Sequence, residues 1–75
     1  MPVKIAEISV RKTPIRLGQF LKLADLVQDG VEAKIVIQEG DVKVNDTVET
    51  RRGRKLYHRD IVTFRDRQVV LLSEP

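Results

Sequence analysis

A helical pattern of apolar residues in the first half of the chain most strongly limits its fold. The members of this pattern recur three or four positions apart, and they are Leu17, Phe20, Leu21, Ala24 and Val27. This spacing places all of them on one side of a helix that spans residues 17–27. Asp29 and Gly30 follow closely and are expected to end the helix, because glycine readily adopts the left-handed conformation found at helix ends.

The next segment, residues 31–39, is compatible with either a strand or a helix. The β-branched run Ile35–Ile37 favours a strand. A helix accounts for more of the pattern, because apolar side chains share one face, polar side chains occupy the others, and Gly40 follows as a stop signal. The apolar face consists of Ala33, Val36 and Ile37. The first half is therefore predicted to contain two helices separated by a short break.

Strands are predicted on both sides of this helix pair. They cover residues 3–10, 42–48, 61–64 and 69–72, with turns at Asn45-Asp46 and at Asp66-Arg67. We therefore predict an α+β fold, in which two short helices pack on a small, antiparallel, twisted β-sheet. At this length, residues 1–75 are expected to form a single domain.

Positive charge is concentrated in two segments, residues 11–22 and 51–59. They hold nine of the 14 Lys and Arg residues, whereas all 11 acidic residues lie outside them. Their basic residues are Arg11, Lys12, Arg16 and Lys22 in the first segment, and Arg51, Arg52, Arg54, Lys55 and Arg59 in the second. Such a separation attracts a polyanion to one face more strongly than a net charge of +3 would suggest. A solvated charged surface without a ligand is the alternative interpretation.

The second basic segment contains residue types that can contact phosphate, although the chain has no glycine-rich phosphate-binding motif. Gly53 lets the backbone approach a phosphate closely, and the neighbouring arginine side chains can each contact two phosphate oxygens. Tyr57 could stack on an exposed base. We favour a structural role for it, as a core or edge residue that anchors the loop together with Leu56. Phe20 and Phe64 are expected in the core.

The sequence argues against an enzyme. His58 is the only histidine, and it is expected to assist phosphate contact, because lone catalytic histidines without an orienting carboxylate are rare. The acidic residues show no regular metal-ligand spacing, and the chain contains no cysteine. We therefore expect no catalytic residue, no metal and no cofactor.

The apolar pattern also bears on the compartment. No apolar run approaches the roughly 20 residues that span a bilayer. Nothing at the amino terminus resembles a signal peptide. The chain is therefore expected to be cytoplasmic and without membrane contact. As a separate expectation, we predict a monomer.

Several short motifs occur in a characteristic order. They are Leu17-Gly18-Gln19-Phe20-Leu21-Lys22-Leu23-Ala24, Glu32-Ala33-Lys34, Gly40-Asp41-Val42-Lys43-Val44-Asn45, and Arg51-Arg52-Gly53-Arg54-Lys55-Leu56 followed by Asp60-Ile61-Val62. This order resembles the S-four RNA-binding domain, a family named after the fourth protein of the small ribosomal subunit. The last motif is similar to the short stand-alone bacterial members, the YaaA-like and YbcJ-like proteins. The likeness covers about residues 15–64.

The resemblance implies an RNA-binding surface made by the helix pair and by the loop between the following strands. The positions that match RNA-facing positions of the family are Lys22, Lys34, Lys43, Asn45, Arg51, Arg52, Arg54 and Lys55, with Arg16 as a weaker candidate. The positions that match the family's core are Ala33, Val36, Val42, Val44 and Leu56. The chain departs from the family at Asp46, where glycine is common, and at Val31, where many members carry arginine.

The leading hypothesis is a non-catalytic RNA-binding protein. The resemblance implies a structured target, such as ribosomal RNA, transfer RNA or a ribosome-associated particle. The alternative is a protein-interaction adaptor whose basic face meets an acidic partner, with Leu23, Leu26 and Ile35 as a docking patch.

Overall fold

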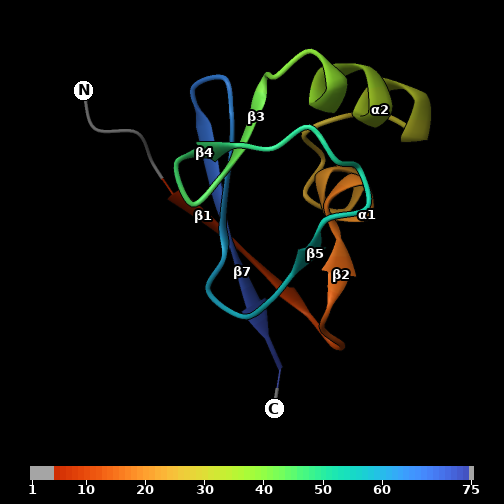
Figure 1. Ribbon diagram of the computed structural model, residues 1–75. Helices are drawn as coiled ribbons and strands as arrows, with labels where there is room; N and C mark the ends of the chain where they lie inside the picture. The colour runs from red at the N-terminus through yellow and green to blue at the C-terminus, as the bar shows by residue number, and fades with distance from the viewer. Residues whose placement is uncertain (1–4, 75) are drawn as a thin grey trace.

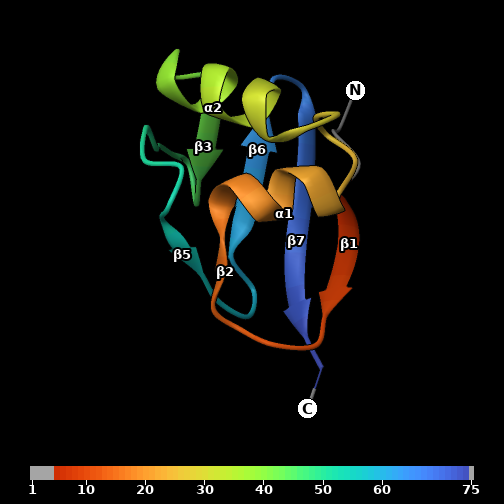
Figure 2. The same cartoon turned by 90° about the vertical axis from the view of Figure 1, so that its right-hand side faces the viewer.

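The computed structural model describes residues 5–74, which form two helices and two sheets (Figure 1). The elements are β1 (Ile5–Val10), β2 (Ile15–Arg16), α1 (Leu17–Leu23), α2 (Gly30–Gln38), β3 (Val42–Val44), β4 (Thr47–Val48), β5 (Lys55–Leu56), β6 (Ile61–Phe64) and β7 (Arg67–Ser73). Both helices cover the same face of the larger sheet (Figure 2). The predicted α+β class is confirmed. Residues 3 and 4 of the expected opening strand lie outside the described residues.

The larger sheet is mixed rather than wholly antiparallel. Its strand order is β1-β7-β6-β3-β4, and β1 runs parallel to β7 from the pair Ile5 and Gln68 to the pair Val10 and Ser73. The other three neighbouring pairs are antiparallel, as predicted. A hairpin forces its two strands to be antiparallel, but β1 and β7 are joined through almost the entire chain, so no hairpin restricts their direction.

The core lies between the helices and the covered face of the sheet. Phe20, Leu17 and Leu21 of α1 are fully buried, and the alternating strand residues Val62 and Phe64 of β6 are also buried. The five positions assigned to the core by resemblance are confirmed there, and they are Ala33, Val36, Val42, Val44 and Leu56. The prediction that both phenylalanines belong to the core is likewise confirmed.

The first helix is shorter than predicted. It ends at Leu23 because Asp25 adopts a left-handed conformation with φ of 58°, although Leu26 and Val27 remain buried beyond the helix. The backbone N–H of Leu26 donates to the carbonyl of Leu21 at 3.0 Å, which closes the helix end. A tight turn of this kind keeps the apolar residues facing the core, and for that reason the sequence pattern resembles a longer helix.

Asp29 has the opposite role from the one predicted. It begins α2 rather than ending α1, because its carboxylate accepts the backbone N–H of Glu32 at 2.8 Å. The carboxylate of Glu32 in turn accepts the N–H of Gln28 at 2.7 Å. Acceptors at these positions satisfy N–H groups that the start of a helix leaves unpaired. The prediction of a helix over the second segment is confirmed.

Neither helix of the described region is long and apolar enough to cross a lipid bilayer.

Candidate nucleic-acid interface

Residues 51–55, which we call the arginine loop, are attached to the start of α1. The N–H of Leu17 donates to the carbonyl of Arg54 at 2.8 Å, and the N–H of Gly18 donates to the carbonyl of Arg52 at 3.1 Å. Just before α1, β2 pairs with β5 at the end of the loop. The first N–H groups of a helix have no partner within the helix, so these carbonyls supply one. The sequence did not predict β2, β5 or this attachment.

The carboxylate of Glu49 binds two arginines of the arginine loop, Arg51 and Arg54. It is only 7% exposed, and its carboxylate accepts hydrogen bonds from the side chain of Arg51 at 3.0 and 3.3 Å and from Arg54 at 3.0 Å. It also accepts the backbone N–H of Arg51 at 3.1 Å. The hydrogen bond from the Arg51 side chain is the main cause that lowers the pKa of Glu49 to about 2, despite the opposing effect of burial. Glu49 precedes the acid-free segment, so counting charges within that segment overlooked it.

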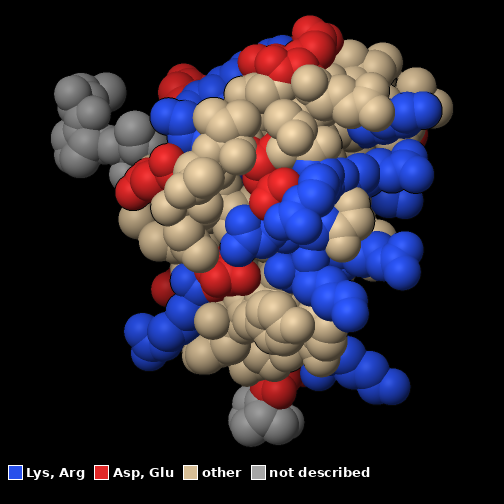
Figure 3. All heavy atoms as spheres, viewed as in Figure 1, with Lys and Arg blue, Asp and Glu red and all other residues tan. Residues whose placement is uncertain are grey.

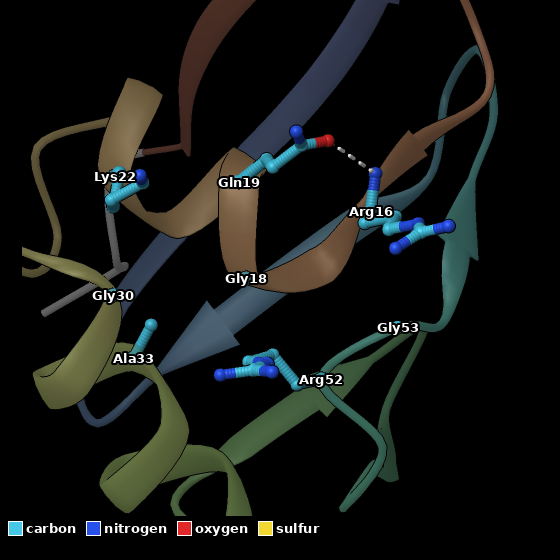
Figure 4. Close-up of a pocket in the computed structure, with 8 residues that line it drawn as sticks. All are labelled: Arg16, Gly18, Gln19, Lys22, Gly30, Ala33, Arg52 and Gly53. Carbon is cyan, nitrogen blue, oxygen red and sulfur yellow. Dashed lines mark hydrogen bonds between the residues drawn. The ribbon is translucent and has the colours of Figure 1, made fainter.

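A cleft of about 300 Å³ lies between α1, the start of α2 and the arginine loop (Figure 4). It is lined by Arg16, Gly18, Gln19, Lys22, Gly30, Ala33, Arg52 and Gly53. Three of these residues are cations and none is acidic. Figure 3 shows basic side chains gathered on the side of the molecule where α1 and β5 lie. A hollow lined by cations and glycine backbone is suited to bind a phosphate group.

Three cations from separate parts of the sequence line this cleft. Arg16 precedes α1, Lys22 lies in its last turn, and Arg52 comes from the arginine loop (Figure 4). Lys34 is exposed on α2, one turn beyond Gly30, and therefore lies on the same side of that helix as a residue that lines the cleft. The family resemblance gave Arg16 only as a weaker candidate for RNA contact. In the structure, Arg16 is one of the residues that line the cleft.

Arg51, Arg54 and Lys55 belong to the arginine loop but line a neighbouring depression instead of the cleft. Two further predicted site residues, Lys43 and Asn45, lie apart from both the cleft and the loop. Lys43 is exposed between the buried Val42 and Val44 of β3, so it projects from the sheet face that the helices do not cover (Figure 2). The side chain of Asn45 is engaged within the fold, because its Oδ1 accepts the N–H of Ile61 at 2.9 Å and its Nδ2 donates to Asp60 at 3.1 Å. The sequence alone could not show whether the amide of Asn45 has a structural role or contacts a ligand.

The departure from the family at Asp46 leaves the turn intact. Asn45 and Asp46 both adopt positive φ, 51° and 69°, between β3 and β4. Two successive left-handed residues are typical of the tight hairpin turn whose twist matches the strands. The side-chain hydrogen bonds of Asn45 help to hold this turn, and the chain accommodates an aspartate at a position where glycine would adopt the conformation more easily.

Tyr57 and His58 follow the arginine loop and Leu56. Tyr57 is 53% exposed, which rules out the core and leaves the edge position as the remaining part of its prediction. His58 was expected to assist phosphate contact, but its Nδ1 accepts the backbone N–H of Ser73 at 2.9 Å. This contact ties the segment after β5 to the end of β7. Of the apolar residues expected to form a docking patch, Leu23 and Ile35 are exposed, whereas Leu26 is buried.

Metal binding finds no support among residues 5–74, which contain no group of three histidine, cysteine or acidic side chains able to hold an ion.

The close approach of the loop to α1 requires glycine at position 18. A Cβ there would lie 2.7 Å from Cγ of Arg52. We expect Gly18→Ala to destabilise the protein by up to about 2 kcal/mol, because overpacking costs about 1–3 kcal/mol and exceeds the roughly 1 kcal/mol that alanine contributes within a helix. Urea unfolding would measure the difference.

Gly30→Ala is the matched control for this prediction. It also adds one methyl group in a helix beside the cleft, but no atom lies within 4 Å of the added Cβ. We expect its stability to be unchanged or higher by up to about 1 kcal/mol. Equal stabilities of the two alanine variants would show that the side chain of Arg52 does not pack closely against α1 at Gly18.

Comparison with known proteins identifies the family of this chain. The S4 domain family matches residues 8–72. The chain is 54% identical to RlbA of Bacillus subtilis, which is named as a ribosome maturation protein, over 73% of this chain and 78% of RlbA. It is 37% identical to YbcJ of Escherichia coli, which is named as an RNA-binding protein, over 92% of this chain and 100% of YbcJ.

A solved structure of one of these relatives has the same fold. The solution structure of Escherichia coli YbcJ is described as containing an αL motif involved in RNA binding. It superimposes with a TM-score of 0.71, covers 92% of this chain and 89% of the YbcJ chain, and shares 37% of its sequence. The chain described here belongs to the S4 domain family.

Proposed function

We propose that this chain is a non-catalytic, cytoplasmic RNA-binding protein that binds structured RNA of the ribosome or of a ribosome-associated particle. The observation that carries the proposal is the acid-free lining of the cleft, to which Arg16, Lys22 and Arg52 contribute three cations. Membership of the S4 domain family and the names of YbcJ and RlbA support RNA as the polyanion and the ribosome as its setting. The cleft is formed within one chain, so binding as a monomer suffices.

The contact surface we propose consists of the cleft, Lys34 and the arginine loop. Arginine and lysine side chains that neutralise phosphates release bound counterions, so binding weakens steeply as salt rises. Phosphate contacts of this kind supply affinity and orientation without reading the base sequence. We leave Lys43 and Asn45 out of this surface, because the first lies on another face and the second is engaged in the turn.

The proposal is tested by removing the three cations of the cleft together. We expect the triple variant Arg16→Gln, Lys22→Gln and Arg52→Gln to bind ribosomal RNA about 100- to 1000-fold more weakly near 0.1 M salt. The slope of log affinity against log salt is expected to become about 2–3 units shallower, since each neutralised phosphate contributes roughly 0.7–0.9. Filter binding over a series of salt concentrations measures both quantities.

A control variant removes the same charge elsewhere. Lys43→Gln, Arg65→Gln and Arg67→Gln change three exposed cations that do not line the cleft. We expect this variant to keep the wild-type salt slope. Equal losses in the two variants would indicate a response to net charge alone and would refute the cleft as the binding site.

The adaptor hypothesis predicts a different outcome in cell extracts. Partners recovered with the protein should be lost after nuclease treatment if RNA is the ligand. Partners that remain after nuclease treatment, together with unchanged RNA affinity of the cleft variant, would favour an acidic protein partner.

A further inference from the structure

We propose that a second depression, beside Tyr57, binds the exposed face of one unpaired nucleobase, so that the RNA target must contain a bulged or looped nucleotide. This inference rests on the proposed RNA binding and specifies which RNA is bound. The depression has a volume of about 600 Å³ and is lined by Arg51, Gly53, Arg54, Lys55, Tyr57 and Asp60. Gly53 also lines the cleft, so the arginine loop separates two neighbouring hollows.

The exposure of Tyr57 is the observation that needs an explanation. The ring is 53% exposed, whereas the preceding Leu56 is fully buried in β5. Side chains alternate along an extended segment, so Lys55 and Tyr57 project to the side opposite Leu56. The chain contains only three aromatic residues, and the other two are buried in the core. Tyr57 therefore contributes its aromatic surface outside the core, next to cations.

The backbone around Tyr57 is held in place before any ligand binds. Its N–H donates to Asp60 Oδ2 at 2.8 Å, and the N–H of Asp60 donates to the carbonyl of Tyr57 at 3.0 Å. The other carboxylate oxygen of Asp60 accepts from Asn45 at 3.1 Å. Asp60 is thus used to shape the turn. A backbone that is already ordered loses less conformational entropy when the side chain it carries binds a ligand.

The neighbouring arginines suit a nucleotide better than an isolated aromatic ligand. Glu49 fixes Arg51 and Arg54 on the same side of the loop, where both line the depression. Guanidinium planes and aromatic rings both stack on bases, and the cations can contact the phosphate of the same nucleotide. A fully paired stem keeps its bases stacked inside and offers no free face. The chemistry therefore selects an unpaired nucleotide next to a phosphate bound in the cleft.

The experiment uses two RNA hairpins with the same stem, each closed by a non-nucleotide linker so that no loop base is present, and one of the two carries a single bulged adenosine. Tyr57 is the only tyrosine and the chain has no tryptophan, so intrinsic fluorescence reports directly on this ring. We expect the bulged hairpin to bind about 10-fold more tightly and to quench the fluorescence, within the roughly 5- to 150-fold range that stacking on one base supplies. The paired hairpin should bind without quenching.

Two variants show whether the aromatic face is responsible. Tyr57→Phe should keep the preference for the bulged hairpin, because the stacking surface remains. Tyr57→Leu should bind both hairpins equally, with an unchanged salt slope because no cation has been removed. Circular dichroism checks that both variants are folded, as the exposure of position 57 leads us to expect.

The possible results separate this inference from the proposed function. Salt-dependent binding of both hairpins with equal affinity and without quenching would overturn the base site and leave RNA binding intact. Loss of the preference in Tyr57→Phe as well would assign it to the hydroxyl group and overturn stacking. Failure of the wild-type protein to bind either hairpin, or ribosomal RNA, would overturn the proposed function and this inference with it.

Discussion

Phe20→Ala is expected to destabilise the protein by about 3–5 kcal/mol, enough to unfold much of the population. Removing a buried phenylalanine loses its transfer free energy and leaves a cavity. Phe20 is fully buried at the centre of α1. A chain of this length has a total unfolding free energy of roughly 4–11 kcal/mol, so the loss is comparable to the whole. Thermal and urea unfolding followed by circular dichroism would measure it.

Leu23→Ala is the matched control on the same helix. Leu23 is the last residue of α1 and is 53% exposed. We expect its replacement to change the unfolding free energy by less than about 1 kcal/mol, because little apolar area returns to water and no cavity forms. A similar loss of unfolding free energy in both variants would mean that α1 does not pack into the core through the face that carries Phe20.

Glu49→Gln is expected to lower the unfolding free energy at pH 7 by about 1–3 kcal/mol. A neutral amide accepts weaker hydrogen bonds from Arg51 and Arg54 than a carboxylate does, and it cannot form their ion pairs. Since Arg51 is 75% exposed, solvent screens part of its contribution, which keeps the effect below that of a fully buried pair.

The same contact makes stability depend on pH in a defined window. The pKa of Glu49 is lowered from 4.5 in the unfolded chain to about 2 in the folded protein. Its contribution is therefore fully present above about pH 4.5 and is lost as the pH falls toward 2. Urea unfolding of the wild type and Glu49→Gln between pH 7 and 2 should show their difference shrinking across this range.

Arg52→Gln is the control for the pH experiment. It removes a loop cation that lies in the cleft lining rather than in the hydrogen-bonded cluster around Glu49. We expect it to retain the wild-type pH dependence of stability. A constant difference between wild type and Glu49→Gln from pH 7 to 2 would contradict the lowered pKa of Glu49.

Local patterns in the sequence predicted most of the fold correctly. The helical spacing from Leu17 onward, the second helix, and the valine alternation around Val42 and Val44 all correspond to observed elements. These predictions succeed because the period of burial along a helix or strand is a local property. The end of α1 was placed too late, since Leu26 and Val27 stay buried in a turn that preserves the apolar spacing.

The candidate site was predicted only in part. Charge counting identified the arginine loop, Arg16 and Lys22, and the family resemblance added Lys34, Lys43 and Asn45. Neither could show that Glu49 holds Arg51 and Arg54, that Lys43 projects from another face, or that Asn45 bonds across to Asp60 and Ile61. Each of these facts depends on contacts between segments, or on the face to which a residue turns.

The sequence by itself determined the α+β class, the core positions and the presence of a basic loop, because apolar periodicity and charge segregation are written along the chain. Only the tertiary structure decided that β1 runs parallel to β7 and that the loop carbonyls of Arg52 and Arg54 cap the start of α1. The tertiary structure also decided which cations line the same cleft. Hydrogen bonds and ion pairs between distant segments depend on how those segments pack in three dimensions. The order of residues along the chain does not show which segments pack together.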